Sequence, residues 1–100
     1  MDKRGALVQM LHQLLKEMEI VSSQGAGYYT CSPFAKRFNK LLGQARGLYE
    51  GDADLISTFE PLPETDPKDP GDKSKVLLEI RVEISQLITL LEATKEGQAS

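Results

Sequence analysis

The sequence predicts an all-α fold: a helical hairpin, a Pro/Asp-rich linker and a long C-terminal helix that completes a bundle as a dimer. Apolar residues recur at helical spacing in three stretches, and residues that start or stop helices bound these stretches. Between the second and third stretches lie four prolines and four acidic residues, which disfavour regular structure. A chain of 100 residues has apolar material for one core, so residues 1–100 are expected to form a single helical domain.

The first helix is expected at residues 6–21. At about 100° per residue its apolar side chains fall on one face, and the polar side chains lie mostly elsewhere. This face consists of Leu7, Met10, Leu11, Leu14, Leu15, Met18 and Val21. The small residues at 22–27 do not favour a helix, and Gly25 is the expected left-handed stop.

The second helix is expected at residues 33–50 and has the clearest start signal of the chain. Ser32 is the expected N-cap, and Pro33 suits the first helical position because no N–H is needed there. After a stop at Gly51, residues 52–59 are expected to add a short helix. Residues 61–73 are expected to form an extended, solvated linker, because they contain little to bury.

The last helix is expected at residues 74–96, with Gly97 as its stop. Its apolar residues recur at intervals of three and four, which predicts a core-facing stripe. A second apolar pair, Leu78 and Val82, lies nearly opposite the middle of that stripe, beside Ser85 and Thr89. A thin three-helix layer does not normally cover both faces, so the sequence favours burial of the extra face against a second copy.

This pattern predicts a non-enzymatic helical self-association or adaptor module whose first partner is itself, as a homodimer. Another protein is the next candidate partner. The candidate self-association residues are Leu77, Leu78, Ile80, Val82, Ile84, Leu87, Ile88 and Leu91.

Charge is distributed unevenly along the chain. The net charge is −3, with residues 1–50 net basic and residues 51–100 net acidic, so the two halves can attract each other within a chain or between subunits. Lys36, Arg37 and Lys40 lie at or beyond the edge of the apolar stripe of the second helix. The alternative function is therefore a nucleic-acid or anionic-ligand binding module that uses this basic face. It ranks below self-association because nucleic-acid domains are usually much more basic.

An aromatic corner is expected between the first two helices, from Tyr28, Tyr29 and Phe34. Packing over the end of the hairpin is its favoured role, and ligand recognition is the alternative.

Catalytic, metal and cofactor chemistry find little support. His12 lacks an acidic or thiol neighbour at helical spacing, and the sole cysteine, Cys31, lacks a nearby base. One Cys and one His cannot build a zinc cluster, and one Cys cannot form an internal disulfide. We therefore expect no enzyme activity, no cofactor and no metal. No stretch approaches the roughly eighteen apolar residues of a membrane span, and the expected location is the cytoplasm.

Overall fold

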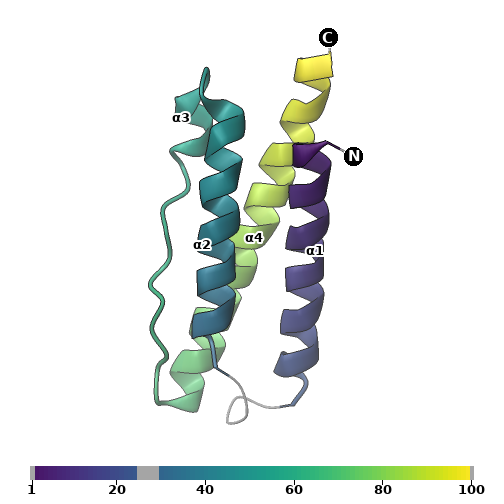
Figure 1. Cartoon of the computed structure of the whole chain (residues 1–100). Helices are drawn as coiled ribbons and strands as arrows, with labels where there is room; N and C mark the ends of the chain where they lie inside the picture. Colours follow the sequence, from purple (N-terminus) through teal and green to yellow (C-terminus); the bar gives the residue numbers. More distant parts are fainter. Residues whose placement is uncertain (1, 25–29, 100) are drawn as a thin grey trace.

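The computed structural model describes residues 2–24 and 30–99, and this part of the chain is all-α (Figure 1). The elements follow one another as four α-helices and one 3₁₀ turn. They are α1 (Lys3–Ser22), α2 (Ser32–Arg46), η1 (Gly47–Tyr49), α3 (Ala53–Ile56) and α4 (Pro70–Ala99). The predicted fold class is thus confirmed for the described residues.

Helix α1 begins at Lys3, three residues before the expected start at residue 6. Asp2 explains the earlier start, because its carboxylate accepts the backbone N–H of Gly5 at 2.6 Å and so caps the first turn. The expected stop at Gly25 lies outside the described residues.

Helix α2 does not use Ser32 as its N-cap. The capping position is Cys31, whose side chain makes no capping bond, and the helix begins at Ser32. The carboxylate of Asp66, far along the chain, accepts the backbone N–H groups of Cys31 and Ser32. The Asp66 carboxylate thus accepts N–H groups that have no partner within the helix, and its negative charge stabilises the positive end of the helix dipole.

The second helical stretch also ends earlier than expected. Helix α2 stops at Arg46 and tightens into the 3₁₀ turn η1, where a continuous helix to residue 50 was expected. The short helix expected at 52–59 is present as the four residues of α3.

Residues 57–69, here called the strap, connect α3 to α4 without a helix of their own. Figure 1 shows the strap running back along α2, so that α4 starts beside the beginning of α2 and the two helices run parallel. Helix α1 runs in the opposite direction to both. The hydrogen bond from Cys31 Sγ to the backbone oxygen of Lys73, at 3.4 Å, joins the two starting ends.

Two side chains of α2 and one side chain of the strap hold the strap against α2. Arg46 donates to the backbone oxygen of Phe59 at 3.0 Å. Asn39 donates to the backbone oxygen of Leu62 and accepts its N–H, both at 2.8 Å, as a neighbouring strand would. The Asp66 carboxylate completes the series at the start of α2. The segment expected to be solvated is therefore extended but anchored along its length.

The anchors match the geometry of a helix beside an extended chain. Ser32, Asn39 and Arg46 recur every seven residues, which places them on one face of α2. The fourteen residues between the outer two advance the helix by about 21 Å. Seven extended residues, from Phe59 to Asp66, cover about 23 Å, so the strap and the helix stay in register.

Helix α4 begins at Pro70, four residues before the expected position. Pro70 suits a first helical position, and the backbone N–H of Lys73 bonds to the oxygen of Asp69 at 3.0 Å. The predicted linker 61–73 is therefore too long at its C-terminal end. The helix also passes through Gly97, which was expected to stop it.

The core lies where α1, α2 and α4 meet, and α4 packs most extensively against α1. Its largest fully buried side chains come from these three helices and from the N-cap of α2. They are Phe38, Leu7, Leu11, Met18, Leu41, Leu42, Ile80, Ile84, Leu87, Leu91 and Cys31. Phe59 at the start of the strap also reaches this core. The molecule measures 47 × 23 × 16 Å along its principal axes, and so thin a body leaves one side of each helix uncovered.

We expect Asn39→Ala to lower the free energy of unfolding by about 1–2 kcal/mol, because both backbone groups of Leu62 lose their partner. Urea denaturation measures this, and limited proteolysis within the strap should accelerate in parallel. Gln44→Ala, an exposed change on the same helix, is the matched control and should stay within about 0.5 kcal/mol. Equal stability of the two variants would show that the Asn39 amide does not hold the strap.

Candidate functional site

The outward face of α4 carries an exposed apolar pair. Leu78 is 58% exposed and Val82 is 49% exposed, and the two lie one helical turn apart. The other large apolar side chains exposed in the described part of the chain are scattered over α1 and α3. These are Met10, Ile20 and Leu55.

The other predicted self-association residues lie inside the chain. Leu77, Ile80, Ile84, Leu87, Ile88 and Leu91 are all buried in the core. Their burial against α1 and α2 makes them unavailable to a second copy. What remains of the predicted set is the Leu78–Val82 pair, here called the ridge.

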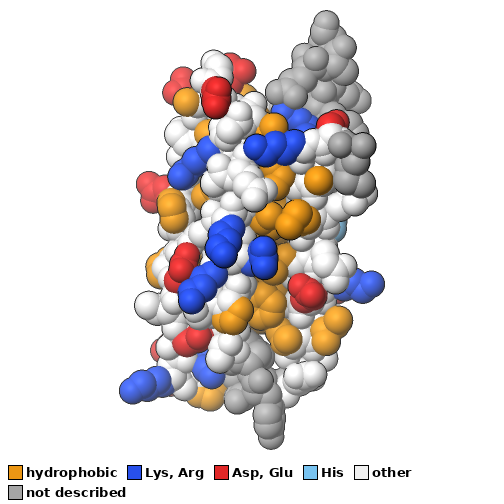
Figure 2. All heavy atoms as spheres, in the orientation of Figure 1, with side chains coloured by type: hydrophobic (Ala, Val, Ile, Leu, Met, Phe, Trp, Pro, Cys, Tyr) orange, Lys and Arg blue, Asp and Glu red, His pale blue; other side chains and the backbone are white. Residues whose placement is uncertain are grey.

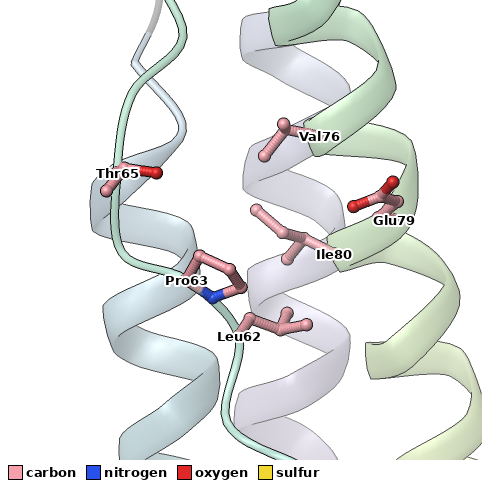
Figure 3. A pocket seen from close by; sticks show the side chains of 6 residues that line it. All are labelled: Leu62, Pro63, Thr65, Val76, Glu79 and Ile80. Atoms are coloured by element: carbon pink, nitrogen blue, oxygen red, sulfur yellow. The ribbon is translucent and has the colours of Figure 1, made fainter.

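A small pocket opens between the strap and α4 (Figure 3). Figure 3 shows Val76 and Ile80 projecting from α4 toward Leu62 and Pro63 of the strap. Thr65 and Glu79 complete the lining, and the volume is about 150 Å³. An apolar cavity of about this size holds one small ring or one branched side chain.

Two shallower hollows flank the ridge. One has a volume of about 390 Å³, and Leu62, Glu79 and Glu83 line it together with the ridge. The other has a volume of about 250 Å³, and Arg81, Ser85 and Gln86 line it with the same two ridge residues. The ridge therefore separates an acidic hollow, walled by the strap, from a hollow that carries an arginine.

The predicted anion-binding residues Lys36, Arg37 and Lys40 are all exposed on α2. Figure 2 shows basic side chains grouped over α2, beside an apolar band between α2 and α1. The described side-chain hydrogen bonds from α2 to the acidic half of the chain come from Asn39 and Arg46 instead. The basic group is thus not used to hold the strap.

The aromatic corner can be placed only in part. Phe34 is half-buried and packs against the core. Tyr28 and Tyr29 lie outside the described residues.

Cys31 is fully buried, and its thiol is not activated. Burial raises the pKa of the Cys31 thiol, and the nearby Asp66 carboxylate raises it further, against a smaller lowering by Lys73. The helix N-terminus therefore does not yield a reactive thiolate here. His12 is exposed on α1.

Arg4 is a buried cation that the sequence analysis did not single out. It is 5% exposed, and its Nη1 lies 3.0 Å from the Tyr49 hydroxyl, 3.1 Å from the Leu91 oxygen and 2.8 Å from Thr94 Oγ1. Its guanidinium carbon lies 5.3 Å from the centre of the Tyr49 ring. These contacts join the start of α1 to the ends of η1 and α4. Arg4 Nη2 is buried without a hydrogen-bond partner among the described residues, and Arg4 lines none of the hollows described above.

Within residues 2–24 and 30–99, no group of His, Cys, Asp and Glu side chains is placed to hold a metal ion. No described helix is both long enough and apolar enough to cross a membrane. Comparisons of the chain with protein-family models, with curated proteins and with solved structures found no match.

We expect Cys31 in the folded protein to react slowly with Ellman's reagent at mildly alkaline pH, because the thiol is buried and its pKa is raised. In urea it should react at the rate of an ordinary thiol. The raised pKa stabilises the fold below the ordinary thiol pKa, and this contribution is lost as the pH rises through the raised value. Rapid, complete labelling of the folded protein would contradict this assignment.

Proposed function

We propose that this protein is a non-enzymatic helical module that associates with a second copy of itself through the outward face of α4. The observation that carries the proposal is the ridge, two large apolar side chains exposed one turn apart on α4. The other apolar residues of α4 in the predicted set are buried in the core. Burying such surface gains about 25 cal/mol per Å² of apolar area. A second copy exposes the same apolar ridge, so one two-fold symmetric contact buries the ridges of both copies.

The charges beside the ridge are compatible with a second copy. Lys75 and Arg81 oppose Glu79 and Glu83 on the same stretch of α4, so this surface carries both signs equally. A surface of one sign would repel its own copy. Another protein with a matching apolar face is the competing occupant, which the experiment below also addresses.

The thiol chemistry fits a non-enzymatic role in the cytoplasm. The buried, protonated Cys31 offers neither a nucleophile nor a disulfide partner, and a reducing compartment preserves such a thiol.

We expect the wild-type chain to form a weak dimer in light scattering behind a sizing column, measured from micromolar to millimolar concentration. The double variant Leu78→Ser, Val82→Ser should remain a monomer over that range, because the apolar area of the ridge is removed. Its unfolding free energy should change by about 1 kcal/mol or less, as for exposed substitutions.

Ile20→Ser is the matched control, since Ile20 is 54% exposed but lies on α1. This variant should dimerise like the wild type. A wild-type monomer at every concentration would refute self-association and leave a different protein as the occupant of the ridge.

The exposed basic residues of α2 favour a second candidate function, binding of nucleic acid or another polyanion. We expect charge reversal at Lys36, Arg37 and Lys40 to leave the fold stable within about 1–2 kcal/mol, because all three are exposed. The wild type should retain no RNA or DNA at near-physiological salt. A tight, salt-sensitive complex lost in the triple variant would place the polyanion function first.

A further inference from the structure

The two flanks of the ridge differ in charge. Taking Val82 as the centre of the outward face and about 100° per residue, Glu79 and Glu83 lie about 60° and 100° to one side. Arg81 lies about 100° to the other side. The lining of the two hollows agrees, with Glu79 and Glu83 in one and Arg81 in the other.

Two-fold symmetry pairs these flanks in one of two ways. When the axis runs along α4, the helices are parallel, and each flank meets the opposite flank of the other copy at the same height. When the axis is perpendicular to α4, the helices are antiparallel, and each flank meets the same flank of the other copy. The antiparallel arrangement therefore places acidic flank against acidic flank and Arg81 against Arg81. Among the four charged residues from 75 to 83, the parallel arrangement brings together only Lys75 and its own copy, so it has fewer like-charge contacts.

The strap adds a difference in shape to the difference in charge. Leu62 is half-buried, its backbone is fixed by Asn39, and its side chain walls the acidic hollow and no other hollow beside the ridge. Leu78, the more exposed residue of the ridge, lies about 40° toward the arginine flank. In a parallel pair, the Leu78 side chain of one copy meets the acidic hollow and Leu62 of the other.

We propose that two copies associate with their α4 helices parallel, with Arg81 of each copy facing Glu79 and Glu83 of the other and Leu78 packed beside Leu62. This inference rests on the proposed self-association and deepens it, because it fixes the orientation and the residue pairs of the contact. It commits to a second copy on the ground of charge complementarity between the two flanks.

Cysteine cross-linking tests the orientation. Thr89 and Lys75 both lie within about 20° of the centre of the outward face, above and below the ridge. In a parallel pair each residue faces its own counterpart, so Thr89→Cys and Lys75→Cys should each form a disulfide-linked dimer under mild oxidation. The wild type is the control, because its sole cysteine is buried.

An antiparallel pair centred on Val82 gives the reverse result. The two copies of residue 89 then lie about 21 Å apart, and a disulfide needs Cα atoms within about 7 Å. Cross-links would form only when the two variants are mixed, joining residue 75 to residue 89. That result would overturn the parallel arrangement while self-association stands. A dimer with no cross-link in any mixture would overturn the parallel arrangement and the placement of the interface on α4. A monomer would refute self-association itself.

Charge reversal tests the residue pairs. Arg81→Glu should raise the dimer dissociation constant by about tenfold or more, because it faces two acidic residues of the other copy. Adding Glu79→Lys and Glu83→Lys to the same chain should restore the wild-type value. Lys16→Glu, an exposed reversal on α1, is the control and should change little. Circular dichroism verifies that each variant is folded, and an unchanged dissociation constant for folded Arg81→Glu would overturn the proposed pairs.

Discussion

The paired hydrogen bonds between the Asn39 amide and the Leu62 backbone are the constraint on which the arrangement of the other elements depends. They fix the strap midway along α2, between the Arg46 and Asp66 anchors. Because the strap returns the full length of α2, α4 can begin beside Cys31 and run parallel to α2. The same bonds place Leu62 against the outward side of α4, where it walls the acidic hollow.

The strap is held by polar contacts because it has little apolar surface to bury. Phe59 reaches the core and Leu62 is half-buried, while most other strap residues are exposed. Each anchor instead satisfies a backbone group that would otherwise lack a partner, including the first N–H groups of α2. Such bonds are worth about 1 kcal/mol each, but they are directional and so select one register of strap against helix.

The spacing of apolar residues along the chain predicted the three main helices and the faces that they bury. The apolar stripes of the three main helices, with Leu11, Phe38 and Ile84, form the core as their spacing indicates. The missed features depend on contacts between residues distant in the chain. Asp66 replaces the expected Ser32 cap across 34 residues, and Arg4 meets Thr94 across 90. Asn39 and Arg46, seven positions apart on one face of α2, were a signal for the strap, but their partners lay in a segment that composition alone marks as solvated.

The candidate site shows why apolar content is insufficient to define an interface. Eight apolar residues of α4 were candidates for self-association, and the six on the core-facing stripe are buried within the chain. For the remaining pair, hydrophobic burial favours association but has no direction, so orientation has to come from the charges and walls beside it. Helix α4 lies behind α1 and α2 in Figure 1, while the basic side chains of α2 face the viewer in Figure 2. The proposed association through α4 would therefore leave the basic side of α2 open in each copy, and a parallel pair would carry two such surfaces running in the same direction.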